Sequence, residues 1–279
     1  MSYKLVCVDM DGTLLNTKHK VSTASREALK KAHDKGVHIV VSTGRMYTDA
    51  EAYSRLIGTK SAVIASNGAY IRENNEIIYK SFFSEEVCLK LFQIFLRYNV
   101  SPMFYTPERI YYGNLMFKIF SDYLKLRGYI NKAVKYKWIG NEKQWKSVFR
   151  LEEGNIVKCE LINTDVNKLK RVREELEKLK EIQVASSSKN NIEINCHGIS
   201  KGTAVERLAA HYNINRKEII AIGDSENDLS MIEFAGMGIA MGNAIDLVKE
   251  KADYITETNS NDGVAKAIDK FINSNEDRI

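Results

Sequence analysis

The stretch Leu5–Thr13, LVCVDMDGT, holds the most informative pattern in the chain: a short apolar run that ends in two carboxylates, two residues apart. An apolar run of this length predicts a buried strand, and the polar, glycine-bearing residues after it predict a tight turn. Asp9 and Asp11 would then lie at the carboxyl end of a strand, where open α/β sheets bind ligands. We expect metal ligands or a nucleophile here, against the plainer alternative of a solvated turn.

A calcium-binding loop also begins with acids at its first and third positions. That loop needs glycine at its sixth position and a bidentate glutamate at its twelfth. Counted from Asp9, these positions hold Leu14 and Lys20. The sequence therefore excludes a calcium loop of this type.

Length and composition predict an ordinary soluble protein. A chain of 279 residues with 44% apolar residues can form about two domains, each with its own core. No apolar stretch approaches the roughly 18 residues of a membrane span, and Asp9 comes too early for a signal-peptide core. The widely spaced cysteines disfavour a zinc cluster or a disulfide framework, so we expect reduced thiols and a cytoplasmic location. They are Cys7, Cys88, Cys159 and Cys196.

The net charge of +5 is spread along the chain, with 41 Lys and Arg residues among 36 Asp and Glu residues. Because no basic block stands out, we expect no nucleic-acid partner. A basic cleft raises the local concentration of anions. The charge therefore suits a small anionic substrate.

Residues 1–83 alternate short apolar runs with helical periodicity, which predicts βαβ units. A helix is expected from Ser22–Thr23 to Gly36, and residues 191–279 return to the same style with a strand at Ile219–Ile222. Residues 84–190 differ, since they contain most of the aromatic residues and longer, more charged helices. The sequence predicts an α/β protein with a Rossmann-like parallel-sheet core from the two outer segments and an inserted α+β domain.

Several polar turns would converge if the strands that end at Asp9, Ser42 and Ile222 were neighbours in one sheet. Up to four carboxylates would then meet, too repulsive a group to stand without a cation. Those carboxylates belong to Asp9, Asp11, Asp224 and Asp228. A hard cation such as Mg²⁺ fits best, since no His or Cys is at hand.

The remaining turn residues suit a phosphate group, because they supply a hydroxyl, a backbone amide, an ammonium and a carboxamide. They are Thr43, Gly44, Lys201 and Asn227. A carboxylate that approaches a phosphate dianion to about 4 Å meets an electrostatic repulsion of roughly 8 kcal/mol at an effective dielectric near 20. Mg²⁺ and Lys201 would cancel that repulsion. Each side chain also has a plainer interpretation, such as a helix cap for Thr43 or Asn227.

Four segments in this order resemble the motifs of the haloacid dehalogenase-like superfamily. They are Asp9–Leu15 (DMDGTLL), Ser42–Arg45 (STGR), Ser200–Gly202 (SKG) and Gly223–Asp228 (GDSEND). Two further segments and the long insertion resemble its Cof-like, sugar-phosphatase branch. They are Asn67-Gly68-Ala69 and Asp262-Gly263-Val264. The chain departs from the family at Met46, where proline often follows the equivalent arginine.

The resemblance implies a two-step phosphatase in which Asp9 forms an aspartyl phosphate while Asp11 first protonates the leaving oxygen and then activates water. It implies Mg²⁺ held by Asp9, the Asp11 backbone carbonyl and Asp224, with Asp228 supporting the metal or Lys201. The phosphoryl group would be held by the Met10 backbone and by the side chains or backbone of Thr43, Gly44, Lys201 and Asn227. In this family the inserted domain is a cap that selects the substrate.

We therefore expect hydrolysis of a small phosphorylated metabolite, such as a sugar phosphate or phosphorylated cofactor, by a monomer or weak homodimer without membrane or nucleic-acid partners. A phosphomutase is the alternative among enzymes, since it shares the acidic motif and the cap. A receiver-like phospho-acceptor signalling protein is the alternative from another class. Such a module is about half this length and needs no inserted cap.

Overall fold

A computed structural model describes residues 2–58, 62–115 and 134–276 of the chain. The chain divides into two compact units. The first consists of residues 1–45, 50–79 and 200–279, and the second of residues 46–49 and 80–199. The segment 84–190, expected from the sequence as an insert, falls within the second unit.

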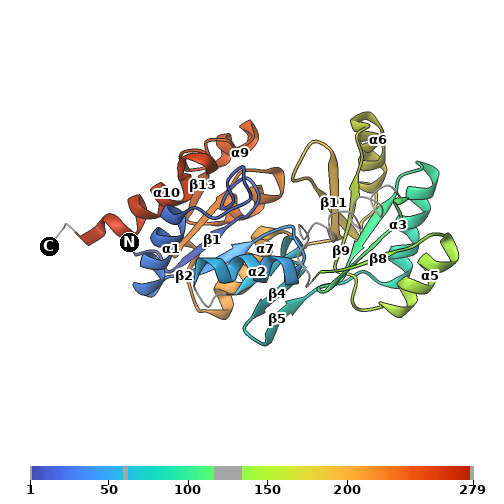
Figure 1. Cartoon of the computed structure of the whole chain (residues 1–279), viewed down its shortest axis with the longest axis horizontal. Coiled ribbons are helices and arrows are strands. Elements are labelled where there is room, and N and C mark those ends of the chain that lie inside the picture. Colours follow the sequence, from blue (N-terminus) through green and yellow to red (C-terminus); the bar gives the residue numbers. More distant parts are fainter. Residues whose placement is uncertain (1, 59–61, 116–133, 277–279) are drawn as a thin grey trace. The chain divides into compact units, whose positions relative to one another are not determined.

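The first unit is built on a sheet of eight strands (Figure 1). The order across this sheet is β14 (Tyr254–Ile255), β13 (Met237–Ala240), β12 (Ile219–Gly223), β1 (Leu5–Val8), β2 (His38–Ser42), β3 (Val63–Ala65), β4 (Tyr70–Glu73) and β5 (Glu76–Lys80). All pairings from β14 to β3 are parallel, whereas β4 runs antiparallel to β3. β1 and β12 are buried throughout and β2 is buried after His38, because the residues of these strands are almost all apolar.

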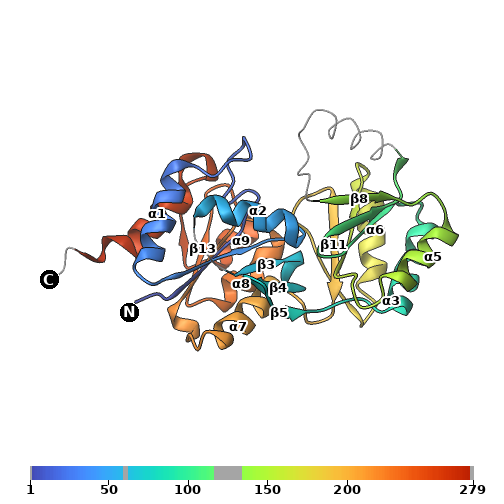
Figure 2. The same cartoon turned by 60° about the horizontal axis from the view of Figure 1, so that its bottom comes forward.

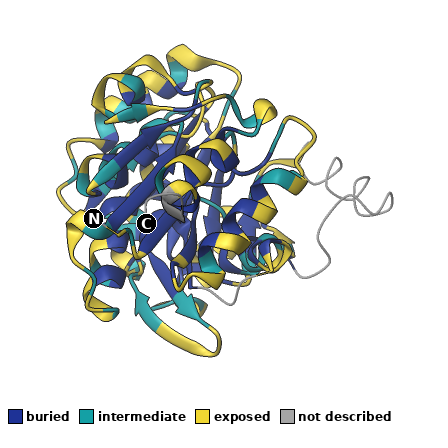
Figure 3. Ribbon diagram, turned by 90° about the vertical axis from the view of Figure 1, so that its left-hand side faces the viewer, coloured by how far each residue is buried: buried dark blue, intermediate teal, exposed yellow. Residues whose placement is uncertain are grey.

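Helices lie on both faces of this sheet, and α1 and α7 are on opposite sides of the strands in Figure 2. The helices of this part of the chain are α1 (Thr23–Asp34), α2 (Tyr47–Ile57), α7 (Lys201–His211), α8 (Leu229–Phe234), α9 (Asp246–Lys251) and α10 (Gly263–Phe271). The α1 helix begins where the sequence predicted, because the Ser22 hydroxyl accepts a hydrogen bond from the Ser25 amide. In Figure 3 most of the strands inside the protein are dark blue and the outer sides of the helices are yellow, as expected for a sheet that forms the core.

The second unit has a mostly antiparallel six-stranded sheet with helices on one face. Its order is β10 (Ile182–Ala185), β11 (Asn191–Cys196), β9 (Lys158–Ile162), β6 (Pro102–Tyr105), β7 (Arg109–Tyr112) and β8 (Lys135–Trp138). Among its described residues, the helices are α3 (Glu85–Arg97), α5 (Glu142–Leu151) and α6 (Val166–Leu176). They bury an aromatic core around Phe104 and Phe149, whose rings are 4.8 Å apart.

The strand order decides where the polar turns fall. Because β12, β1 and β2 are adjacent and parallel, the turns after Val8, Ser42 and Gly223 leave the same edge of the sheet. The expectation that these strands are neighbours is confirmed, and so is the α/β fold with a parallel core. No helix among the described residues is long and apolar enough to cross a membrane.

Candidate active site

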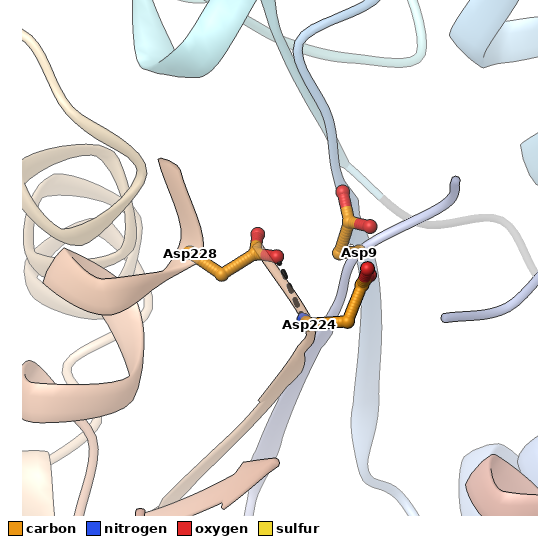
Figure 4. A group of neighbouring side chains, drawn as sticks. All are labelled: Asp9, Asp224 and Asp228. Carbon is orange, nitrogen blue, oxygen red and sulfur yellow. Dashed lines mark hydrogen bonds between the residues drawn. The ribbon is translucent and has the colours of Figure 1, made fainter. Parts of the chain in front are cut away.

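Three carboxylates gather at the carboxyl edge of the central strands. Asp9, Asp224 and Asp228 each offer one oxygen to a group in which all three atoms lie within 4.8 Å of one another. Figure 4 shows Asp9 at the end of β1 facing the two side chains that follow β12. The sheet register explains this meeting, since the Asp9 amide continues the β1–β12 ladder by donating to the Ile222 carbonyl at 2.9 Å.

A buried lysine joins two of these carboxylates. Lys201 Nζ donates to Asp9 Oδ1 and to Asp228 Oδ1, each at 2.6 Å, and its side chain is wholly inaccessible to solvent. Lys201 is the first residue of α7, and the Ser200 hydroxyl caps this helix by accepting a hydrogen bond from the Thr203 amide. The cap fixes the start of the helix, which sends the lysine side chain into the acidic group.

Asp228 holds the turn as well as the lysine. Its Oδ2 atom accepts hydrogen bonds from the backbone amides of Asp224 and Ser225, both at 2.9 Å (Figure 4). With Oδ1 on Lys201, both oxygens of Asp228 are engaged. This arrangement suits a supporting role for Asp228 better than direct contact with a substrate.

Burial and repulsion by neighbouring carboxylates make ionisation of Asp9 and Asp224 unfavourable. Burial first, and then the charge of Asp228, raises the pKa of Asp9 well above its usual range, although Lys201 opposes this. The same two causes raise the pKa of Asp224 to about 6. Burial lowers the pKa of Lys201, but Asp228 and Asp9 raise it by more, so the ammonium stays charged. One ammonium among three carboxylates leaves the group net negative, which favours a bound cation.

The Asp224 side chain is oriented by the turn after β1. Thr13 donates its hydroxyl to Asp224 Oδ1 at 2.7 Å, and Ser225 donates to Oδ2 at 3.0 Å. Gly12 has φ +84°, and a Cβ built on it would lie 2.4 Å from Asp224 Oδ2. Only glycine therefore allows this close approach between the two turns.

Asp11 lies apart from the three-carboxylate group. Its oxygens accept hydrogen bonds from Arg45 Nη2 at 2.6 Å and Arg45 Nε at 2.7 Å, and the side chain is nearly half exposed. The structure therefore differs from the sequence-based expectation that up to four carboxylates meet. A bidentate guanidinium satisfies the Asp11 carboxylate outside the group.

The residues expected to hold a phosphate lie in turns at this same edge. Thr43 and Gly44 follow β2, and Thr43 Oγ1 accepts a hydrogen bond from the Arg45 amide at 3.1 Å. This is a contact within the turn and not a cap of α2, which begins at Tyr47. Asn227 is buried, and its Nδ2 atom donates to Asn67 Oδ1 at 3.2 Å. Met10 is wholly buried, and its carbonyl accepts from the Leu15 amide at 2.8 Å.

Sequence reasoning gave no role to several residues that hold the turn after β1. Asn243 Nδ2 donates to the Gly12 carbonyl at 2.8 Å, and Asn259 Nδ2 donates to the Leu15 carbonyl at 2.8 Å. The Asn259 amide in turn donates to Asn243 Oδ1 at 2.9 Å. The two contacts with the turn span 231 and 244 positions in sequence, and only the strand order could have indicated them.

Comparison with known proteins identifies the family. A family model described as haloacid dehalogenase-like hydrolase matches residues 6–268. The chain belongs to the haloacid dehalogenase-like hydrolases. It is 33% identical over 270 residues to the 5-amino-6-(5-phospho-D-ribitylamino)uracil phosphatase YcsE of Bacillus subtilis, covering 96% of both chains. The expected family is thereby confirmed.

Solved structures of the family share the fold. A haloacid dehalogenase-like hydrolase from Bacillus subtilis superposes with a TM-score of 0.85 at 28% identity, covering 96% of this chain and 100% of that one. A sugar phosphatase of subclass IIB superposes with a TM-score of 0.79 at 26% identity, covering 96% and 98%. The expected enzyme class, a phosphatase of this family, is confirmed. The receiver-like alternative is set aside, because the family model spans both core segments.

Proposed function

We propose that the protein is a Mg²⁺-dependent phosphatase that hydrolyses small phosphate monoesters through an aspartyl phosphate on Asp9. Lys201 supports this proposal most strongly, because it brings a buried positive charge to within 2.6 Å of the proposed nucleophile. The relatives named above act on a ribityl phosphate and on a sugar phosphate. We infer that the substrate carries its phosphate on a polyhydroxylated carbon chain.

The acidic group fits magnesium by its donor chemistry. Oxygens of three carboxylates lie within 4.8 Å of one another, and among the described residues no thiol or imidazole belongs to this group. Hard oxygen donors of this kind suit Mg²⁺. We propose that Asp9, Asp224 and the Asp11 backbone carbonyl hold the ion, and that Asp228 supports the site through Lys201. Bound Mg²⁺ would neutralise charge on the phosphoryl oxygens during transfer.

The first proposed step is attack of Asp9 on phosphorus. Lys201 engages Asp9 Oδ1, and we propose that Oδ2 is the attacking oxygen. Lys201, the Asn227 carboxamide, the Thr43 hydroxyl and the Met10 and Gly44 amides would stabilise the phosphoryl group. The Asp9 carboxylate forms the new bond to phosphorus while the bond to the leaving oxygen breaks.

The proposed proton transfers belong to Asp11. As a general acid it would give a proton to the leaving oxygen, and as a general base it would then take one from the attacking water. The observed ion pair with Arg45 holds the Asp11 carboxylate away from the acidic group. Asp11 must therefore leave Arg45 during the cycle, which makes this ion pair a resting arrangement.

Substitution and chelation test the proposed function. Asp9→Asn should abolish hydrolysis of para-nitrophenyl phosphate while the protein stays folded, because Lys201 keeps Asp228 as its partner and the amide relieves repulsion among the carboxylates. Asp34→Asn, at an exposed aspartate of α1, is the matched control and should retain activity. EDTA should silence the parent, and Mg²⁺ should restore it. Turnover by Asp9→Asn, or by the parent in chelator, would refute the proposal.

A phosphomutase remains the alternative within the family, and product analysis decides between them. A phosphatase releases inorganic phosphate from a sugar phosphate, whereas a mutase accumulates a sugar bisphosphate and an isomer of the starting ester. The cytoplasmic location and the monomeric or weakly dimeric state stay predictions.

A further inference from the structure

A buried turn after β3 has three consecutive residues with left-handed backbone conformation. The φ angles are 52° at Ser66, 57° at Asn67 and 100° at Gly68. These residues form the short turn η1 (Ser66–Gly68), and all three are buried. Left-handed backbone is unfavourable for a residue with a Cβ and persists where surrounding contacts enforce it, often at functional sites. The proposed function gives this turn no role.

The turn contacts two of the loops that carry proposed site residues. The Asn67 amide donates to the Thr43 carbonyl at 3.0 Å, and the Ser66 amide donates to the Arg45 carbonyl at 2.8 Å. A Cβ on Gly68 would lie 2.5 Å from the backbone oxygen of Ser200, the residue before Lys201. The turn is therefore packed between the loop after β2 and the start of α7.

The Asn67 side chain reaches a third loop. Asn67 Oδ1 accepts the hydrogen bond from Asn227 Nδ2 at 3.2 Å, and both side chains are more than nine-tenths buried. The two N–H groups of a carboxamide share one nitrogen and one plane. A hydrogen bond that fixes one N–H therefore fixes the direction of the other.

Other left-handed asparagines of the chain lack this setting. Asn74, Asn99 and Asn213 have φ between 49° and 56°, but all three are exposed. Asparagine adopts this conformation readily in surface turns. Burial and the bond to Asn227 distinguish Asn67 from these ordinary turn residues.

We infer that Asn67 is a positioning residue that aims the Asn227 carboxamide at the phosphoryl group of the substrate. This inference rests on the proposed function, in which Asn227 binds that group. Asn67 touches no substrate itself in this arrangement. It acts through Asn227, and its left-handed backbone is what brings its side-chain oxygen to that partner.

A double-mutant cycle tests this inference. Asn67→Gly removes the carboxamide but keeps the left-handed conformation accessible, since glycine adopts it without a steric penalty. Asn213→Gly makes the same change at an exposed left-handed asparagine and is the matched control. These two variants are compared with the parent, with Asn227→Ala and with the Asn67→Gly/Asn227→Ala double variant. The readouts are kcat and KM for para-nitrophenyl phosphate, Ki for inorganic phosphate, and melting temperature.

We expect Asn67→Gly to raise Ki for phosphate about tenfold, the effect of one misdirected hydrogen bond to a charged group. KM should rise in parallel. The melting temperature should fall further than that of Asn213→Gly, because Asn67 is buried and its loss leaves a buried N–H of Asn227 without this acceptor. In the Asn227→Ala background, Asn67→Gly should change Ki by less than about twofold, because the carboxamide that Asn67 positions has been removed.

Two results would overturn the inference: a Ki for Asn67→Gly equal to that of the parent, or independent effects of the two substitutions on Ki. Independent effects would assign the side chain a purely structural role. A parent that fails to hydrolyse phosphate esters would instead reject the proposed function. An active parent with independent effects rejects only the role of Asn67.

Discussion

Removing the buried ammonium of Lys201 should destabilise the fold as well as abolish activity. At 2.6 Å and an effective dielectric near 20, each contact of Lys201 with Asp9 and Asp228 contributes a gross attraction of about 6 kcal/mol. Much of this attraction is offset by the cost of desolvating the three charges. Loss of one partner from a buried ion pair typically costs about 3–5 kcal/mol, because the remaining charge is left uncompensated.

We therefore expect Lys201→Met to lose about 3–5 kcal/mol of unfolding free energy. For a unit of this size, that loss corresponds to a fall in melting temperature of about 6–20 °C. Lys30→Met is the matched control, because Lys30 contacts Asp34 at the same 2.6 Å but on the surface. An exposed pair of this kind contributes about 0.5 kcal/mol or less.

Calorimetry in EDTA measures both variants, and added Mg²⁺ should raise the melting temperature of Lys201→Met more than that of the parent. The double variant Lys201→Met/Asp228→Asn should recover part of the lost stability, since one uncompensated carboxylate becomes a neutral amide. It should stay inactive. A melting temperature of Lys201→Met equal to that of Lys30→Met would refute the reasoning that the acidic group depends on a cation.

The remaining predictions concern the Asp224 carboxylate. Gly12→Ala should abolish turnover and weaken activation by Mg²⁺, because its Cβ would displace Asp224 Oδ2. Gly36→Ala is the matched control, because Gly36 is also left-handed but has no atom within 4 Å of the added Cβ. It should cost only about 1 kcal/mol of stability and keep activity. Equal kinetics for the two variants would contradict this prediction. In metal-free protein, the pKa of Asp224 is raised from 3.8 to about 6, so the folded state holds a proton that the unfolded state releases. Its contribution of about 3 kcal/mol to the unfolding free energy is present at low pH and lost as pH rises from about 4 to about 6. Denaturant melts should show the unfolding free energy falling over this pH range in the parent, and falling less in Asp224→Asn. Equal slopes in the two proteins would contradict the prediction.

The sequence predicted where the polar turns meet, because these turns follow the ends of strands. Apolar runs before Asp9, Ser42 and Asp224 each predicted a parallel strand, and adjacent parallel strands leave little freedom for where their turns meet. Lys201 was predicted from its motif alone. Its burial and its two carboxylate contacts needed the packing of α7.

Other features depend on side-chain reach and backbone conformation, which a single sequence does not specify. The length of the Arg45 side chain lets it bind Asp11 outside the acidic group. The left-handed conformation of Ser66 has no signal in residue type, since serine seldom adopts it. Residues 46–49 group with the second unit although the sequence around them is typical of the first.

The covalent intermediate gives the most direct test of the central claim, that Asp9 is the nucleophile. The parent protein, mixed with a phosphate ester and Mg²⁺, is quenched in acid during turnover and reduced with borohydride, which converts an aspartyl phosphate to homoserine. Mass spectrometry of the peptide that contains residue 9 should find homoserine there, and none when Mg²⁺ is omitted. Homoserine at another aspartate, or unmodified Asp9 during rapid turnover, would contradict the account.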